Sequence, residues 1–242
     1  MYRIIADTHC HTVASTHAYS TVDENAAYAA ETGLKILALT DHGPALSDAP
    51  HRWHFYNLGV LPRKISGVVI LRGAEANIID FDGNLDMDQV CYKRLEWINA
   101  SFHQESCKPG TVEEHTRAYL AVAQNPYVDV IAHSGTESFR YDYEAGVKAF
   151  KEYGKLVEIN EGSQRVRTDS LKNCAEIAKL CKKYEVPVVV SSDAHYKTSL
   201  GSYTASLKML EEIDFPEKLI LNADITRFCA YLKEKRGLEI PF

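Results

Sequence analysis

The feature that most restricts the fold of this sequence is the alternation of short apolar runs with helix-like segments. Strands that alternate with helices favour a parallel sheet. Seven such units in about 200 residues favour a closed barrel over an open sheet. We therefore expect an α/β barrel. The apolar runs with the length and composition of buried strands are Arg3–Ala6, Ile36–Leu39, Val68–Leu71, Trp97–Phe102, Val128–Ala132, Leu156–Ile159 and Val188–Val190.

Helix signals lie between most of these runs. Thr111 to Glu114 has the form of a capping box, which predicts a helix that continues to about Ala123. Two stretches break the pattern: the proline-bearing Gly43–Ser66, and the aspartate-rich Ala76–Gln89, where we expect a small hairpin or loop. No linker or low-complexity region appears, so residues 1–242 are expected to form one domain. The other predicted helices are Asp23–Thr32, Asp142–Tyr153, Ser170–Tyr184, Ser206–Ile213 and Ile225–Arg236.

Composition excludes several classes of protein. The formal net charge is −6 and no long basic run occurs, so binding to nucleic acid is not expected. The N-terminal apolar run is too short for a signal peptide, and no segment approaches the roughly 20 apolar residues that cross a bilayer. These features predict a cytoplasmic protein without membrane contact. Six scattered cysteines without a C-x-x-C pair are expected to be reduced and mostly buried, rather than disulfide-bonded or bound to zinc.

Side chains of the types that bind metals follow six of the seven predicted strands. Successive members lie roughly 30 residues apart, which is the length of a strand–helix unit with its loops. The C-terminal ends of the strands meet at one face of a barrel. We therefore expect these side chains to converge at that face. They are His9, His11 and His17 after the first strand, then His42, Glu75, His103, His133, and finally Asp193 and His195.

Local spacing supports the convergence. In His9-Cys10-His11 and in Asp193-Ala194-His195, the strand period of two places the outer residues on one side and the middle residue on the other. A single histidine is most often a hydrogen-bonded structural residue, but a crowd of neutral imidazoles would leave many acceptor nitrogens without partners. Metal ions satisfy them all. Histidines with carboxylates and no cysteines suit Zn, Mn or Fe better than Mg or Ca.

This set of motifs resembles the PHP (polymerase and histidinol phosphatase) family. The resemblance extends from Ile4 to about Asn222, and every ligand position carries the residue type that the family has there. Within the family the chain is most similar to the small bacterial phosphatases that bind three zinc ions, and the stretch from Pro50 to Phe55 supports that placement. The resemblance implies a PHP-type domain folded as a distorted, TIM-like (β/α)7 barrel, with three divalent transition-metal ions, zinc foremost and manganese or iron as alternatives.

The resemblance also implies an activity. The chain would be a metal-dependent phosphoric monoester hydrolase that acts on small phosphorylated substrates through a hydroxide bridging two metals. After the carboxylates and the hydroxide are counted, about three positive charges would remain to attract a phosphate dianion to an acidic protein. The family divides the ligands into His9, His11, Glu75 and Asp193 for one ion, His17, His42 and His195 for a second, and His103 and His133, with Glu75 as a bridge, for the third.

Several further residues are candidates for supporting roles. His54 and Arg52, with His51, lie in the long loop that faces the same end of the barrel, where they would bind the phosphate or protonate the leaving oxygen. Weaker candidates for the phosphate are Arg63, Arg165 and Lys197.

Three residues near the motifs have predicted roles of other kinds. Asp7 and Asp41 are interpreted as acceptors that orient ligand imidazoles, although strand alternation beside His42 would turn Asp41 away. His115 lies inside a predicted helix and is expected on the surface.

The alternatives share much of this chemistry. A histidinol-phosphate phosphatase would differ only in its pocket. A phosphodiesterase or exonuclease of the polymerase-associated type would need a groove for nucleic acid, and a non-catalytic metal-binding module would need no substrate. A nucleophilic triad built on Ser134 is disfavoured because the histidines are better explained as ligands. The sequence leaves the substrate, the native metal, the general acid and the oligomeric state open.

Overall fold

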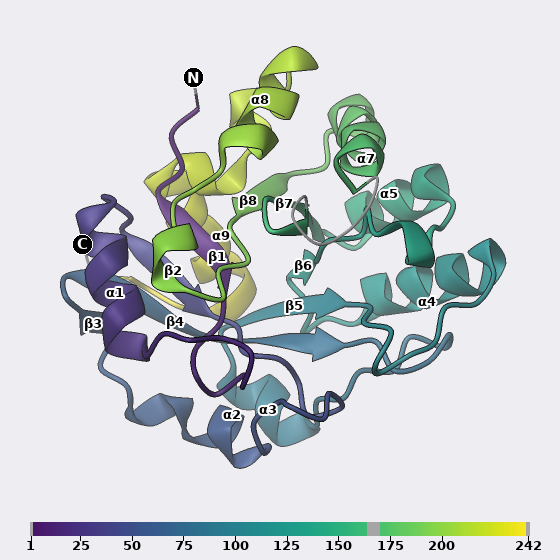
Figure 1. Ribbon diagram of the computed structural model, residues 1–242. Coiled ribbons are helices and arrows are strands. Elements are labelled where there is room, and N and C mark those ends of the chain that lie inside the picture. Colours follow the sequence, from purple (N-terminus) through teal and green to yellow (C-terminus); the bar gives the residue numbers. More distant parts are fainter. Residues whose placement is uncertain (1, 164–169, 241–242) are drawn as a thin grey trace.

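The computed structural model describes residues 2–163 and 170–240. Its parallel strands form a nearly closed barrel with helices outside, so the predicted fold class is confirmed (Figure 1). The hydrogen-bonded order is β1-β2-β4-β5-β6-β7-β8, and β3 pairs antiparallel with β4. The strands are β1 (Ala6–Cys10), β2 (Ile36–Leu39), β3 (Lys64–Ile65), β4 (Val68–Asn77), β5 (Trp97–Ser101), β6 (Val130–Ile131), β7 (Leu156–Asn160) and β8 (Val188–Ser191).

The helices follow the predicted pattern closely. Thr111 and Glu114 form the capping box that was expected at the start of α4, because each side chain pairs with the other residue's backbone N–H. Asp142 caps α5 through the backbone N–H of Ala145. The described helices are α1 (Val22–Glu31), α2 (Trp53–Asn57), α3 (Gln89–Arg94), α4 (Val112–Gln124), α5 (Tyr143–Glu152), α7 (Ser170–Tyr184), α8 (Thr204–Glu212) and α9 (Ile225–Arg236).

Two strand predictions were wrong in their bounds. The first strand is not Arg3–Ala6 but β1, which carries Asp7 and His9, both fully buried. The third does not stop at Leu71, because β4 continues to Asn77. In both cases polar residues were read as the end of a strand. They remain in the strand because each is buried next to polar partners or next to other proposed ligands.

The irregular stretches contain short elements. In Ala76–Gln89 the predicted hairpin is confirmed: Ile78 bridges Leu85, and the Ile79 N–H donates to the Asn84 carbonyl at 2.9 Å. The stretch 43–66 contains α2, β3 and a turn of 3₁₀ helix (Leu58–Val60). Helices α2 and α3 were both missed, since five and six residues are too few to show a helical period.

The barrel closes along a seam between β1 and β8. At one end of the seam the His11 N–H donates to the Ala194 carbonyl at 2.9 Å. Nearer the N-terminal ends of these strands, the fully buried side chain of Asn222 bridges β1 and β8 in place of direct backbone hydrogen bonds. Its Nδ2 donates to the Ala6 and Val190 carbonyls at 2.8 and 2.7 Å, and its Oδ1 accepts from the Val190 N–H at 3.0 Å.

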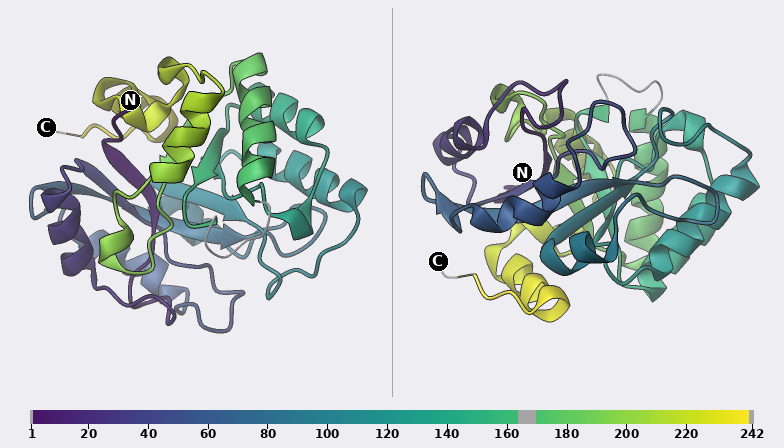
Figure 2. Two further views of the ribbon diagram at one scale, coloured as in Figure 1. Left: turned by 45° about the horizontal axis from the view of Figure 1, so that its top comes forward. Right: turned by 90° about the horizontal axis from the view of Figure 1, so that it is seen from below.

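Helix α9 covers the N-terminal end of the barrel. Its Phe228 and Leu232 are fully buried against Trp97 and the inward-facing apolar side chains of the strands. In Figure 2 (right) this helix, in yellow, lies opposite the loops that follow the strands. The strands therefore present their C-terminal ends to the open face. All six cysteines are free and five are buried, as predicted. Within the described residues, no helix has the length and apolar character of a membrane span.

Candidate metal centre

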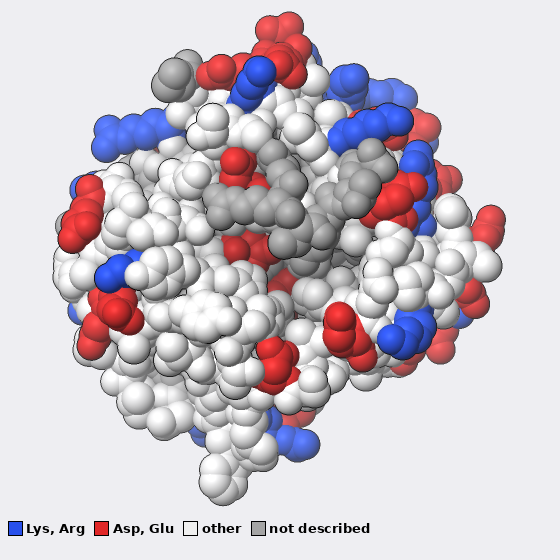
Figure 3. All heavy atoms as spheres, viewed as in Figure 1, with Lys and Arg blue, Asp and Glu red and all other residues white. Residues whose placement is uncertain are grey.

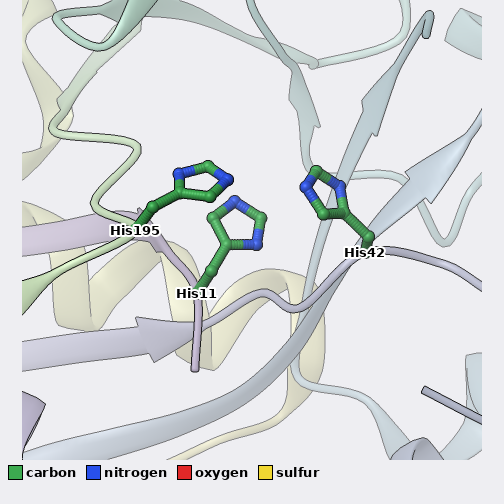
Figure 4. A group of neighbouring side chains, drawn as sticks. All are labelled: His11, His42 and His195. Atoms are coloured by element: carbon green, nitrogen blue, oxygen red, sulfur yellow. The ribbon is translucent and has the colours of Figure 1, made fainter. Parts of the chain in front are cut away.

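The structure brings the nine predicted ligands together at the C-terminal end of the barrel. Figure 4 shows three of them, His11, His42 and His195, with their imidazoles turned toward one another. The ring centroid of His11 lies 4.3 Å from those of both His42 and His195. His9 lies in β1 and Glu75 in β4. His11 and His17 follow β1, His42 follows β2, His103 follows β5, His133 follows β6, and Asp193 and His195 follow β8.

Glu75 lies at the centre of the group and is fully buried. Its Oε2 lies 2.8 Å from His42 Nδ1 and 3.2 Å from His9 Nε2. Its Oε1 lies 2.7 Å from His133 Nε2 and 3.4 Å from His103 Nε2. One carboxylate therefore faces two pairs of imidazoles, which is the arrangement that a bridging ligand requires.

The remaining members form groups of the size that holds one ion. Asp193 Oδ1 lies 3.1 Å from His11 Nε2 and 3.5 Å from His9 Nε2. His17 Nε2 lies 2.9 Å from His195 Nε2 and 3.3 Å from His42 Nε2. Three sets have donor atoms within 4.8 Å of one another: His9, His11 and Asp193; His11, His42 and His195; and His42, Glu75 and His103.

Four of the histidines share one arrangement of their two ring nitrogens. In each, Nδ1 contacts an oxygen that is not one of the proposed metal-binding atoms. This contact holds a proton on Nδ1 and leaves the lone pair of Nε2 directed inward. The contacts are His9 with Glu158 at 2.7 Å, His103 with Asn77 at 2.7 Å, His195 with the Asp193 carbonyl at 3.0 Å, and His17 with Asp48.

These oxygen partners were not predicted. Glu158 ends a strand and was visible in the sequence as a polar residue there, but nothing showed that it pairs with His9 from the opposite side of the barrel. Asn77 lies at the end of β4, beyond the predicted end of that strand. Asp48 lies in the long irregular loop and carries no motif.

The pKa values of the buried histidines and carboxylates in this group depend on one another. Burial opposes a charge on His9, but the carboxylates around it, Glu158 first, raise its pKa well above the ordinary value. Burial would raise the pKa of Glu75, but the histidines, His9 first, hold it well below the usual range. Burial and the neighbouring His42 lower the pKa of His11 to about 3, so its imidazole is neutral near pH 7. A neutral imidazole is the form that binds a metal.

The donor set fits divalent transition-metal ions. Four buried atoms of the proposed ligands have no hydrogen-bond partner among the described residues: His9 Nε2, His11 Nδ1, His42 Nδ1 and Glu75 Oε2. Each unpaired buried group costs about 1–3 kcal/mol. When His9 is in the neutral form that binds a metal, with its proton on Nδ1 facing Glu158, the Nε2 lone pair faces the carboxylate of Glu75. A cation between these two atoms turns their repulsion into attraction. Imidazole nitrogens with carboxylate oxygens are typical ligands of zinc.

A cavity of about 740 Å³ opens above these residues. Figure 3 shows the hollow in this face, with acidic side chains inside it. Its size is within the range of small-molecule sites. The described lining contains no lysine or arginine; it includes the ligands His17, His42, His103, Asp193 and His195, the apolar or aromatic Tyr19, Leu46 and Tyr196, and the acidic Asp48 and Glu105.

His54 and Arg52, the main candidates for phosphate binding, are not in the described lining of this cavity. His54 Nε2 lies 3.3 Å from Asp41 Oδ2, and the exposed Arg52 pairs with Asp88 at 4.0 Å. Their roles toward a substrate stay predictions. His51 contacts the Trp53 ring.

The weaker phosphate candidates are also placed elsewhere or are not described. Arg63 is engaged with Glu96 at 2.8 Å. Lys197 is outside the described lining of the cavity. Arg165 lies outside the described residues.

Neither predicted acceptor orients a ligand imidazole. Asp7 accepts from the Ser192 N–H at 3.1 Å and from the Tyr203 hydroxyl at 2.9 Å, so it stabilises the seam between β1 and β8. Asp41 accepts from the Thr12 N–H at 2.8 Å, which fastens the loop after β1. Alternation turns Asp41 away from the side on which His42 lies.

The prediction that His115 is a surface residue was wrong. The side chain is buried on the inner face of α4, against Phe102 and Phe139. Its Nε2 accepts from the Gly110 N–H at 2.8 Å, and its Nδ1 donates to the Arg140 carbonyl at 2.8 Å. The ring therefore joins the loops that follow β5 and β6, and a lone histidine in a helix gives no sign of such a contact.

Comparison with known proteins places this geometry in context. The PHP domain model matches residues 7–217. A probable phosphatase of Clostridium novyi (strain NT) is 46% identical over 238 residues, which cover 98% of each chain. A probable phosphatase of Acetivibrio thermocellus is 47% identical over 234 residues, which cover 97% of each chain.

A solved structure has the same fold at much lower identity. It is the histidinol phosphate phosphatase of Lactococcus lactis subsp. lactis, complexed with Zn, L-histidinol and phosphate. It superposes with a TM-score of 0.59 at 13% identity, over 87% of this chain and 94% of that chain.

Proposed function

Since this chain belongs to the PHP domain family, we propose that it is a metal-dependent phosphatase that hydrolyses small phosphomonoesters. The observation that carries the proposal is the convergence of imidazole lone pairs on Glu75 and Asp193 at the base of a cavity. Its relatives with 46% and 47% identity are named probable phosphatases, which supports the reaction class.

We further propose that the centre holds three divalent ions, zinc foremost, with manganese or iron as alternatives. The ligands would be His9, His11, His17, His42, Glu75, His103, His133, Asp193 and His195. Such ions, when bound, lower the pKa of water so that hydroxide is available near neutral pH, and they supply positive charge to the phosphoryl oxygens.

The chain's own residues prepare the site for that chemistry. Glu158 and Asn77 hold protons on the outer nitrogens of His9 and His103, so the inner nitrogens stay neutral donors in fixed directions. Glu75 and Asp193 contribute only two negative charges to the base of the cavity. A phosphate dianion therefore meets a net positive base once the ions are present.

The cavity wall favours a substrate with a single phosphate. Tyr19 and Tyr196 offer exposed aromatic surface to an organic group. Asp48 and Glu105 on the wall repel a second anionic group, and the described lining offers no cation to bind one. A polynucleotide carries a phosphate at every residue, so this wall supports a phosphomonoesterase over a nuclease.

The test combines metal analysis with turnover. We expect close to three transition-metal ions per chain and hydrolysis of p-nitrophenyl phosphate that is lost on chelation and restored by Zn²⁺ or Mn²⁺. At most one ion, with no turnover after metal is supplied, would overturn the proposal. Histidinol phosphate, glycerol phosphate and a single-stranded oligonucleotide should be compared in the same assay. Faster cleavage of the oligonucleotide would favour the nuclease.

A further inference from the structure

The proposed ion positions differ in how deeply the chain encloses them. The side chains of His9 and His133 are 0% and 1% exposed. Those of His17 and His195, at the outer edge of the group, are 47% and 31% exposed. A deep imidazole is held in place by packing on every side. An outer imidazole is free to turn unless a specific contact fixes it.

His17 has such a contact with Asp48. The Asp48 carboxylate accepts from His17 Nδ1, and the Asp48 carbonyl accepts from the Thr16 N–H at 3.1 Å. The carboxylate and the backbone of one residue therefore hold two consecutive residues of the loop after β1. The His17 Nε2 is left facing His42 and His195.

The segment that carries Asp48 is fastened to the barrel. The Gly43 N–H donates to the Glu75 carbonyl at 2.8 Å, and the Ala45 N–H donates to Asp86 Oδ2 at 2.9 Å. Leu46, within the segment, is buried. These contacts give Asp48 a defined position, although its side chain is 34% exposed.

We propose that Asp48 is a positioning residue for the outermost ion, because it fixes the tautomer and the ring direction of His17. The inference rests on the proposed function, since it presupposes the metal centre. The corresponding partners of His9 and His103, Glu158 and Asn77, lie in strands. Asp48 is the partner that comes from the long loop, so retention of the outer ion depends on the seating of residues 43–49.

The test measures metal retention with Asp48→Ala, Asp48→Asn and the matched control Ser47→Ala. Ser47 is exposed and lines the same cavity. Loss of an outer partner typically weakens a metal site by roughly 10–100-fold. We expect Asp48→Ala to weaken one of three Zn²⁺ ions by that factor in a titration against buffered free Zn²⁺, and to remove one component of the visible Co²⁺ spectrum. Asp48→Asn keeps an acceptor oxygen and should retain the ion more tightly than Asp48→Ala. Ser47→Ala should match the wild type.

Each other outcome decides against the inference. Asp48→Ala that retains three ions with unchanged affinity would overturn it and leave the proposed function intact. Loss of all three ions would also overturn it, since it would show Asp48 to be a general structural support. Wild-type protein that binds no ions would overturn the proposed function together with the inference. Thermal unfolding of the chelated proteins controls for folding, and we expect equal midpoints because a pair this exposed contributes little.

Discussion

Two buried carboxylates at opposite ends of the barrel meet the cost of burial in different ways. At the C-terminal end, Glu75 Oε2 has no hydrogen-bond donor among the described residues, and nearby histidines hold the pKa of the group well below its usual range. At the N-terminal end, Asp129 accepts from the Ile98 N–H at 2.8 Å, from the Tyr231 hydroxyl at 3.2 Å and from the Arg236 guanidinium. Its pKa is raised by burial, which the arginine only partly offsets.

The difference between these two surroundings indicates that the N-terminal end of the barrel contributes to stability and the C-terminal end to chemistry. Around Asp129 the chain supplies every partner itself, and Lys155 completes the region by donating to the Asn125 and Val128 carbonyls. Around Glu75 the chain supplies imidazole nitrogens, which bind a metal through their lone pairs. A bound cation would therefore complete the interactions of this carboxylate. In barrels of this type the C-terminal end carries the active site and the N-terminal end carries stability. The predictions below follow that division, from the largest expected effect to the smallest.

Glu75→Gln should remove activity without unfolding the protein. An amide loses the negative charge that faces His9 and His42. We expect p-nitrophenyl phosphate hydrolysis to fall roughly 10³-fold or more and bound metal to decrease. The chelated variant should stay folded but unfold at a lower temperature than the chelated wild type, because the buried histidines that lower the pKa of Glu75 lose their counter-charge. Near-normal turnover by a variant with full metal content would contradict the proposed bridging role.

Asp129→Asn should have the opposite effect. It leaves Arg236, whose side chain is only 11% exposed, without its counter-charge. Breaking a buried pair costs about 3–5 kcal/mol, to be measured by urea unfolding of the chelated protein. The value of kcat/KM at a temperature where the variant stays folded should equal that of the wild type. A fall in kcat/KM there would show that the two ends are coupled.

Asn222→Ala tests the seam that joins the two ends. It removes the bonds to the Ala6 and Val190 carbonyls and leaves these groups buried. We expect a loss of about 2 kcal/mol in the free energy of unfolding and faster hydrogen exchange at the Val190 amide. Asn84→Ala, at an exposed hairpin, is the matched control and should change stability by less than about 0.5 kcal/mol. Equal effects of the two changes would show that the Asn222 side chain does not stabilise the seam.

The last prediction concerns pH and Lys155. Burial lowers the pKa of this amine from 10.5 to about 8. Between these two values the unfolded chain keeps a proton that the native protein has released, so native stability rises with pH across that window and the full penalty applies below pH 8. Urea unfolding of wild type and Lys155→Met between neutral and strongly alkaline pH isolates this contribution. Curves that stay parallel throughout would contradict it.

What the sequence predicted, and what it did not, has a physical pattern. His42, Glu75, His103 and His133 were predicted because a barrel converts regular spacing along the chain into proximity at one end. Asp48 was not predicted, because its contact with His17 depends on the path of an irregular loop.

Two further misses have the same origin. Glu158 lies on a strand, but its pairing with His9 depends on which strands the barrel places across from each other. The buried His115 was taken for a surface residue. Helical spacing places it on the face of Ala118, Tyr119 and Val122, but its bonds to the loops depend on the path of the chain. Regular elements can thus be predicted from spacing, whereas contacts between loops require the three-dimensional path of the chain.

The seam between β1 and β8 also determines when, during synthesis of the chain, the proposed metal centre can be completed. A chain is synthesised from its N-terminus at about 5–20 residues per second. When the first 160 residues exist, seven of the nine proposed ligands are present, but β1 has no neighbour on its open side. Asp193 and His195 follow with β8, and Asn222 comes later still. The complete set of donors therefore assembles only after β8 has joined the barrel, when most of the chain has been synthesised.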